Sequence, residues 1–299
     1  MPAPRQTASY LMKRFAEVGI RPATKHGQNF LIDLNLINLL VQSADIGPDD
    51  VVLEIGTGTG SLTAMMAEQA AAVVTVEIDA AMQQLASEAL IDFRNVVMLR
   101  QDALKNKNRF HPSVLDAVRR QLEVSPNRRL KLVANLPYNI ATPVLSNLLS
   151  FEPWPHSMVA TIQKEVAERI AARPCTKDYS ALSVWMQCQC DIEIVRILPP
   201  TVFWPRPKID SAIIRIVPNA EKRARLSDPP AFHEFARSMF FHRRKFLRSE
   251  LLSAYKDRLD KPAVDALLAE MQFEPTTRAE ELEVETLMKL FETVRTKLG

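Results

Sequence analysis

The stretch VVLEIGTGTG, residues 51–60, joins an apolar run to a cluster of glycines. The apolar run predicts a short buried strand, and the pattern over 61–70 predicts the helix that follows it. Three of the seven glycines in the chain, Gly56, Gly58 and Gly60, lie between the two. Glycines at this point let the backbone turn tightly and let a ligand approach without a Cβ in the way. The stretch therefore predicts the first strand, turn and helix of a ligand-binding sheet.

Apolar runs and helical patterns alternate outward from this stretch as far as residue 218. Further strands are expected at 73–78, 96–99, 130–136, 158–163, 191–198 and 211–218. Further helices are expected at 7–18, 33–45, 79–90 and 164–173. This alternation predicts an α/β fold with a Rossmann-like, doubly wound parallel sheet that is covered on both faces. The last two expected strands are joined by a short proline-rich turn. They could therefore also pair as an antiparallel hairpin at the sheet edge.

After Pro218 only helical periodicity remains. The expected helices are 229–240, 243–257, 261–271 and 279–296. The connecting segment NAEKRARLSDPP is charged and ends in two prolines, which is typical of a linker. We therefore expect two domains, with the sheet in residues 1–218 and a small all-helical domain in residues 219–299.

Composition narrows the classes of protein. Of the 299 residues, 47% are hydrophobic and 24% are charged, which argues against a disordered or fibrous chain. Cys175, Cys188 and Cys190 lack the paired C-x-x-C spacing of a zinc site, so we expect reduced thiols and no metal. No apolar run reaches the roughly 18 residues of a membrane span. We expect a cytoplasmic protein without a secretory signal, and the basic N-terminus leaves a mitochondrial presequence as the alternative.

Two acidic residues frame the glycine turn. Glu77 closes the second expected strand, where a carboxylate can accept hydrogen bonds from the hydroxyls of a ribose. The glycine spacing is G-x-G-x-G, not the G-x-G-x-x-G of dinucleotide-binding turns. Glu54, just upstream, would repel a pyrophosphate and attract a cationic amino-acid group. Together these features favour S-adenosyl-L-methionine over NAD, with an ordinary tight turn as the alternative.

Two further candidate sites follow later strands. Asp102 could accept a hydrogen bond from an adenine amino group, or it could cap a helix. The segment NLPY, residues 135–138, ends the fourth strand near the expected ligand crevice. The Asn135 side chain and a carbonyl at Pro137 offer two acceptors for an exocyclic amine, and Tyr138 offers a face for stacking a base. Such a segment favours methyl transfer to an amine, with a loop that buries its tyrosine as the alternative.

Several segments in a fixed order carry a resemblance to a known family. They are GQNFL (27–31), EIGTGTG (54–60), VEID (76–79), QDA (101–103), NLPYNIATP (135–143), QKEV (163–166), YSALSV (179–184) and FWPRPKIDSAIIRI (203–216). Together they resemble the ribosomal RNA adenine N6,N6-dimethyltransferase family of the KsgA type. The resemblance runs over about residues 23–217 and continues weakly through HRRKFLRSEL (242–251). It implies dimethylation of two adjacent adenosines near the 3′ end of small-subunit (16S) rRNA, within the pre-30S particle.

The resemblance also implies roles for single residues. The implied contacts with S-adenosyl-L-methionine are Gln28, Asn29, Leu31, Gly56, Gly58, Glu77, Asp102 and Asn135. The implied catalytic residues are Asn135, Pro137, Tyr138 and Phe203. Gln28, Asn29 and Leu31 would close over the methionine end of the cofactor. Phe203 would be a second aromatic wall for the target base; without the resemblance it is equally well explained as a core aromatic at a strand end.

Basic residues are unevenly distributed behind the formal net charge of +3. Arg243, Arg244, Lys245 and Arg248 put cations on adjacent turns of one expected helix and predict an RNA-binding stripe, with a solvated helix face as the alternative. The segment 103–131 is also basic and is longer than the family pattern suggests. It is either a solvated surface helix or an added contact with the rRNA backbone.

Two other functions stay open at this point. One is a large-subunit rRNA adenine methyltransferase of the antibiotic-resistance kind, and the other is a non-catalytic assembly or transcription factor on the same fold. The NLPYNI form and the long PRPKIDSAIIRI segment favour the small-subunit enzyme. We further expect a monomer that does not contact membranes and that has a role in small-subunit biogenesis.

Overall fold

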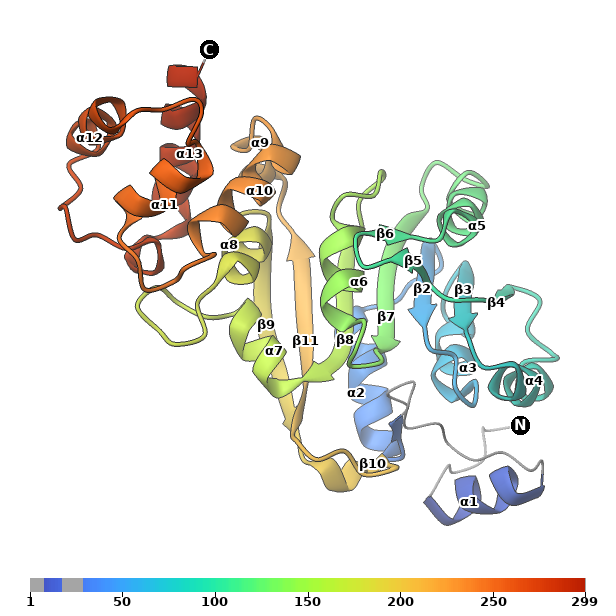
Figure 1. The fold of residues 1–299 in the computed structure, drawn as a ribbon. Coiled ribbons are helices and arrows are strands. Elements are labelled where there is room, and N and C mark those ends of the chain that lie inside the picture. The colour runs from blue at the N-terminus through green and yellow to red at the C-terminus, as the bar shows by residue number, and fades with distance from the viewer. Residues whose placement is uncertain (1–7, 18–28, 299) are drawn as a thin grey trace. The chain divides into compact units, whose positions relative to one another are not determined.

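The computed structural model describes residues 8–17 and 29–298, whose elements are labelled in Figure 1. In this part of the chain a seven-stranded sheet has the order β4-β3-β2-β7-β8-β11-β9. Its strands are β2 (Asp50–Ile55), β3 (Ala72–Glu77), β4 (Val96–Arg100), β7 (Arg129–Asn135), β8 (Ser157–Gln163), β9 (Cys190–Leu198) and β11 (Ser211–Pro218). The strands from β4 to β8 in this order are parallel, and β11 runs antiparallel to β8. The expected α/β sheet is confirmed, and β11 makes it mixed instead of wholly parallel.

The chain reverses its direction of travel across the sheet at β2. From β2 it moves outward through β3 to β4, and it then crosses back to β7 on the other side of β2. Both β2 and β3 are buried along their whole length, as expected for apolar parallel strands covered on both faces. Loops that leave two neighbouring strands in opposite directions open a crevice at the carboxyl ends of these strands. The topology thus places a ligand crevice between β2 and β7.

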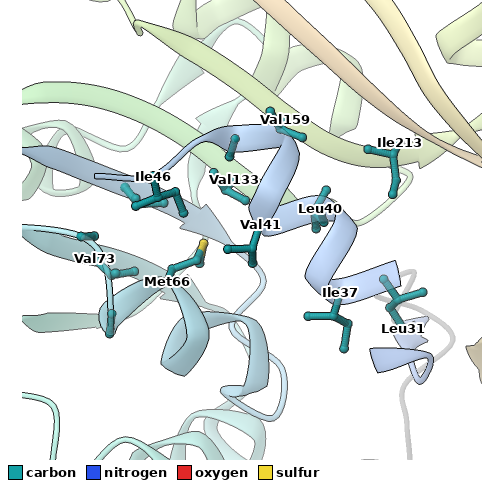
Figure 2. Packing of buried hydrophobic residues seen from close by; sticks show 14 of the residues in the cluster. Leu31, Ile37, Leu40, Val41, Ile46, Met66, Val73, Val133, Val159 and Ile213 are labelled. Atoms are coloured by element: carbon teal, nitrogen blue, oxygen red, sulfur yellow. The ribbon is translucent and has the colours of Figure 1, made fainter. Parts of the chain in front are cut away.

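Helix α2 (Leu34–Ala44) covers one face of the sheet. It begins where the Asp33 side chain caps the first turn by accepting backbone hydrogen bonds. Leu40 and Val41 on its inner face are almost fully buried. Figure 2 shows this face packed against strand residues, which include Val133, Val159 and Ile213.

A buried ion pair joins the start of β2 to β7. Lys131 Nζ lies 2.8 Å from Asp50 Oδ2, and both side chains are almost completely buried. Lys131 also donates to the carbonyl of Ala44 at the end of α2, at 3.0 Å, and Arg129 lies 3.0 Å from the same aspartate. Removing either partner would leave an uncompensated buried charge. These two cations of the basic 103–131 segment therefore have a structural role.

The remaining elements of the sheet-bearing part surround the central strands. They are α1 (Ala8–Glu17), α3 (Ser61–Ala67), α4 (Ala80–Ala89), α5 (Pro112–Leu122), α6 (Ala141–Leu148) and α7 (Lys164–Ile170), with the short strands β1 (Phe30–Leu31), β5 (Leu104–Asn106), β6 (Arg109–Phe110) and β10 (Phe203–Trp204). β1 pairs antiparallel with β10, and β5 pairs with β6 in a hairpin. The segment 103–131 thus holds a hairpin, the helix α5 and the start of β7, so it contains more than the surface helix that was one of the two alternatives.

Contacts divide the chain into two compact units, one of 1–167 with 193–218 and the other of 168–192 with 219–299. The second unit contains α8 (Ala181–Gln187), α9 (Ala220–Ala224), α10 (Pro229–Met239), α11 (Leu247–Ala254), α12 (Lys261–Glu270) and α13 (Val284–Leu298). The segment 168–192, which we expected with the sheet, groups with these helices. The buried Tyr179 hydroxyl donates to the carbonyl of Leu282 at 2.9 Å, which is one physical reason for this grouping.

Candidate active site

The carboxyl ends of β2, β3 and β7 surround a pocket of about 810 Å³, counting the space open to solvent. Eight residues that the sequence singled out line it: Asn29, Gly56, Gly58, Glu77, Asp102, Asn135, Pro137 and Tyr138. They come from distant parts of the chain and meet because parallel strands end at one edge of a sheet. A smaller hollow adjoins this pocket, shares Gly56, Gly58 and Asn135 with it, and is also lined by Glu54 and Leu31.

The glycine turn has the backbone conformation that the sequence suggested. Gly56, Gly58 and Gly60 have φ values of 91°, 54° and 81°, a region that residues other than glycine rarely adopt. A Cβ added to Gly58 would lie only 3.1 Å from the ring of Phe30. The turn therefore lets the aromatic ring and the backbone approach one another at the wall of the pocket.

Glu77 is buried at the end of β3 and is held by backbone donors. Its Oε2 accepts a hydrogen bond from the N–H of Gly58 at 3.0 Å, and its Oε1 accepts one from Asp79 at 2.9 Å. Burial raises the pKa of Glu77, and these hydrogen bonds oppose the shift. Each carboxylate oxygen retains a further lone pair, so the side chain can still accept hydrogen bonds from ribose hydroxyls.

Glu54 lies beneath the same turn. Its Oε2 accepts hydrogen bonds of 2.6 Å from the hydroxyls of Thr63 and Thr75, while its Oε1 is buried without a hydrogen-bond partner among the described residues. Burial raises the pKa of Glu54 to about 8. The unsatisfied oxygen at the wall of the smaller hollow suits a cationic donor, as the sequence suggested.

The NLPY segment presents acceptors to the pocket, but not the pair that the sequence predicted. Asn135 Nδ2 donates to the carbonyl of Asn29 at 2.7 Å, and Asn135 Oδ1 accepts no hydrogen bond from the part of the chain that the structure describes. The carbonyl of Pro137 already accepts a hydrogen bond from Ile140 at 3.1 Å, because it closes a turn. The carbonyl of Leu136 accepts no hydrogen bond from the described residues, and the next residue, a proline, has no N–H. The geometry therefore favours Leu136 O over Pro137 O as the second acceptor.

Tyr138 is half-buried in the wall of the pocket, and its hydroxyl is held in place. It lies 2.6 Å from the hydroxyl of Ser211, the first residue of β11. Burial raises the pKa of Tyr138, so the phenol stays neutral and can share this hydrogen bond. The sequence analysis missed Ser211 because no local signal relates a strand residue to a tyrosine so far away in the chain.

Three residues at the end of β3 and β4 suit a purine. Asp102 is exposed at the rim, and its Oδ1 accepts a hydrogen bond from the N–H of Leu104 at 2.9 Å. Because Leu104 is the first residue of strand β5, Asp102 does not cap a helix. Its other oxygen accepts no hydrogen bond from residues 8–17 or 29–298 and can accept one from a ligand. Gln101 lines the pocket, and its Nε2 is buried without a hydrogen-bond partner among the described residues. Ile78 adds an apolar wall that is 47% exposed.

Phe203 does not line this pocket. It pairs with Leu31 in the β1–β10 ladder, is 2% exposed, and packs in the same hydrophobic core as Leu31 and Ile37. This placement matches the alternative of a core aromatic at a strand end, because the short antiparallel pair turns the side chain inward. Leu31 is also buried there. Gln28, predicted to contact the cofactor, lies outside the described residues.

Helix α1 packs against the aromatic residue above the glycine turn. The rings of Phe15 and Phe30 meet edge to face at 5.4 Å, and Phe15 contacts Trp204 at the same distance. Phe15 is itself almost fully buried. This cluster fixes Phe30, which the sequence analysis did not select, at the wall of both hollows.

The predicted RNA-binding cations divide into two kinds. Arg243 forms an ion pair with Glu280, and Arg248 forms a bidentate pair with Asp265. Arg244 and Lys245 are exposed and form no ion pair within the described part of the chain. The expected stripe on one helix is wrong, because α11 begins only at Leu247 and Arg243, Arg244 and Lys245 lie in the turns before it. Opposite charges pair with two of the four cations and leave Arg244 and Lys245 for an external anion.

The β5–β6 hairpin carries further exposed cations beside the pocket. Lys105, Lys107 and Arg109 are exposed and have no ion-pair partner among residues 8–17 and 29–298. The hairpin is closed at its base by a hydrogen bond from His111 N to the carbonyl of Ala103, a pocket residue. Its cations are thus near the rim that Asp102 forms.

The described residues contain no group of three or more His, Cys, Asp or Glu side chains that could hold a metal. Cys188 and Cys190 are buried, and burial raises the pKa of both thiols. In the same part of the chain, no helix is long and apolar enough to cross a membrane.

Comparison with known proteins agrees with this geometry. The model of a family described as ribosomal RNA adenine dimethylase matches residues 21–295. A protein of Lactococcus lactis subsp. lactis (strain IL1403), named ribosomal RNA small subunit methyltransferase A, is 38% identical over 266 residues, which are 89% of this chain and 87% of the relative.

Two solved structures show the same fold. A dimethyladenosine transferase from Plasmodium falciparum has a TM-score of 0.74 at 24% identity, over 89% of this chain and 97% of that one. The 23S rRNA methyltransferase ErmE has a TM-score of 0.63 at 25% identity, over 89% and 100%. Because the family match extends from before the glycine turn to the last helix, this chain belongs to the ribosomal RNA adenine dimethylase family.

Proposed function

We propose that this chain transfers methyl groups from S-adenosyl-L-methionine to the N6 amines of two adjacent adenosines near the 3′ end of small-subunit rRNA. The observation that carries the proposal is the position of two free acceptors, Asn135 Oδ1 and Leu136 O, in the same pocket as Glu77. The relative from Lactococcus lactis is named as a small-subunit enzyme, which supports the choice of RNA.

The cofactor half of the pocket has a place for each part of the proposed ligand. Glu77 would accept the ribose hydroxyls, and Asp102 would accept from the adenine amine while Gln101 Nε2 donates to a ring nitrogen. Glu54 Oε1 would accept from the ammonium of the methionine part, with Asn29 and Leu31 beside it. When bound, S-adenosyl-L-methionine supplies a strongly electrophilic methyl group.

The residues of the NLPY segment would hold the amine in line with that methyl group. Two acceptors at Asn135 and Leu136 can bind both hydrogens of N6, which localises the nitrogen lone pair for attack. Tyr138, held by Ser211, would stack on the target base and fix its plane. Since two methyl groups are added to each amine, the pocket must also admit a monomethylated amine. The aromatic role that the resemblance implies for Phe203 stays a prediction.

The RNA would be bound through its phosphates by exposed cations of both units. We assign this role to Arg244 and Lys245 of the helical unit and to the β5–β6 hairpin beside the pocket. In this proposal residues 1–218 bind the cofactor, carry out transfer and contribute the hairpin cations to RNA binding, and residues 219–299 bind rRNA. We propose a cytoplasmic monomer that acts on the pre-30S particle.

The direct test is methyl transfer from radiolabelled S-adenosyl-L-methionine to three substrates: undermethylated small subunits, large subunits, and naked rRNA. We expect N6,N6-dimethyladenosine at two adjacent positions of small-subunit rRNA only. Dimethyladenosine on large-subunit rRNA alone would instead support the activity named for ErmE. No transfer to any substrate by a folded, cofactor-binding protein would support the non-catalytic alternative.

A further inference from the structure

The pocket and the smaller hollow beside it meet at four residues that line both, namely Phe30, Gly56, Gly58 and Asn135. All four belong to the unit formed by 1–167 and 193–218. Phe30 is the one aromatic residue among these four, and the proposed transfer gives it no role. The junction of the two hollows therefore has an aromatic ring in its wall whose function is unassigned.

The proposed function puts the sulfonium group of the cofactor at this junction. Glu77 and Asp102 would bind the ribose and the adenine in the pocket, and Glu54 would bind the ammonium in the smaller hollow. The sulfur atom joins the ribose to the methionine chain, so it has to lie where the two hollows meet. Asn135, which would hold the target amine, lines the same junction. Phe30 is thus beside the atom that carries the transferred methyl group.

The ring of Phe30 is supported by two aromatic side chains that line neither hollow. Trp204 lies nearly parallel to it, with 27° between the planes and 6.5 Å between the centroids, and Phe15 meets it edge to face at 5.4 Å. A Cβ on Gly58 would come near only Cδ1 and Cε1, which form one edge of the ring. Since Trp204 takes one face and Gly58 an edge, the other face is left for the junction.

An aromatic face at this point distinguishes the cofactor before transfer from the cofactor after transfer. The π electrons make the face negative, so it attracts a nearby cation. S-adenosyl-L-methionine has a positively charged sulfonium, whereas S-adenosyl-L-homocysteine has a neutral thioether at the same place. The two molecules share the adenine, the ribose, the ammonium and the carboxylate. A contact with the sulfur is therefore the contact that can tell them apart.

We propose that Phe30 is a charge-selective contact for the sulfonium and makes the site favour the methyl donor over the demethylated product. The proposal rests on the proposed function, because it takes S-adenosyl-L-methionine as the ligand. When the methyl group bonds to the amine, the electrons of the C–S bond stay on sulfur, so the charge that the ring attracts is lost. Two methyl groups on each of two adenosines require repeated exchange of product for fresh cofactor, which weaker binding of the product assists.

The test measures the Kd of three ligands for the full chain by isothermal titration calorimetry: S-adenosyl-L-methionine, S-adenosyl-L-homocysteine and sinefungin. Sinefungin has an amine-bearing carbon in place of the sulfonium, so it is cationic there but has no methyl group to transfer. Phe30→Leu should weaken binding of the two cationic ligands about fivefold more than binding of S-adenosyl-L-homocysteine. Phe30→Tyr, which keeps an aromatic face, should retain the wild-type ratio of the Kd values.

Two further variants make the result specific to the ring. Phe30→Met is a second variant without an aromatic face, whose flexible side chain can refill the space beside Phe15 and Trp204. Ile78→Ala is the matched control, because Ile78 lines the pocket but not the smaller hollow, on the side where the adenine would lie. Since all three ligands carry adenine, Ile78→Ala should weaken them equally. Thermal unfolding of the same proteins shows that the fold is retained.

Two results would overturn the proposal. Equal weakening of all three ligands by Phe30→Leu and Phe30→Met would mean that the ring is only an apolar wall. A loss for S-adenosyl-L-methionine that sinefungin does not share would mean that the methyl group is recognised and the charge is not. Methyl transfer is measured on the same wild-type preparation, so transfer to rRNA without a charge preference at Phe30 refutes this contact alone. A charge preference without transfer to any rRNA refutes the proposed function and leaves the contact standing.

Discussion

The pocket at β2 and β7 and the basic segment 243–248 were both selected from the sequence, and the structure resolves them differently. In the pocket, eight selected residues from five separate segments come together. In the basic segment, two of four selected cations are neutralised by Glu280 and Asp265 from later helices and turns. Residues at strand ends converge because the sheet topology brings the ends of parallel strands to one edge. A run of basic residues, in contrast, does not determine which acidic residues will pack beside it in the folded chain.

The largest effect should come from the amine-holding end of the pocket. Asn135→Ala removes Oδ1 and the hydrogen bond to Asn29, so kcat should fall about 10³-fold. Cofactor binding, measured by calorimetry, should change far less. A residual rate within tenfold of wild type would show that the amine is held elsewhere and would break the comparison at its strongest point.

The cofactor end comes next. Glu77→Ala should raise the Kd for S-adenosyl-L-methionine about 100-fold, because it removes the ribose acceptor and releases the N–H groups of Gly58 and Asp79. Circular dichroism should show an intact fold. Unchanged affinity would refute the ribose role, and Glu77→Gln, which keeps part of the hydrogen bonding, should lie between the two.

The burial of the Glu54 carboxyl group should be visible in how the free energy of unfolding depends on pH. Its pKa is about 8 in the folded chain against 4.5 as the ordinary value, because burial disfavours the ionised form. Between these values only the unfolded chain releases the proton, so the free energy of unfolding falls as pH rises, by up to about 1.4 kcal/mol per unit. Glu54→Gln should remove this slope in urea denaturation from pH 5 to 8. Parallel curves for the two proteins would contradict the assignment.

Substitutions of the unpaired and of the ion-paired basic residues should have different effects on RNA affinity. Arg244→Ala with Lys245→Ala should weaken binding about tenfold at low salt and reduce the salt dependence by roughly one to two counterions. Arg248→Ala, which removes a cation already paired with Asp265, should leave the affinity within about twofold of wild type. Equal losses for both variants would mean that the ion pair opens on RNA and that the whole stripe binds.

The smallest effect tests the support behind the pocket. Ser211→Ala frees the Tyr138 hydroxyl and should lower kcat/KM by about threefold to tenfold, with a stability loss of about 1 kcal/mol. Tyr138→Phe removes the same hydrogen bond and should have a similar effect on kcat/KM. If Ser211→Ala were silent while Tyr138→Ala were severe, stacking alone would position the base.

The sheet could be predicted because most of its strands have a recognisable local sequence pattern. β2, β3 and β8 are nearly continuous apolar runs, and Asp33 and Asp79 cap helices from a position beside the first turn. The small pairs β1–β10 and β5–β6 could not be predicted, because two or three residues carry no periodicity. Phe203 is an example, since its position in the core follows from its pairing with Leu31, which no local pattern indicates.

By itself the sequence determined the α/β sheet, the glycine turn and the chemistry of the residues at the strand ends. These depend on backbone conformation and hydrophobic pattern, which neighbouring residues set. Only the tertiary structure decided that Leu136 and not Pro137 has the free carbonyl, that Ser211 holds Tyr138, and that Arg243 and Arg248 are paired. Each of these is a choice of hydrogen-bond or ion-pair partner across the fold, and such a choice is made only when distant segments pack together.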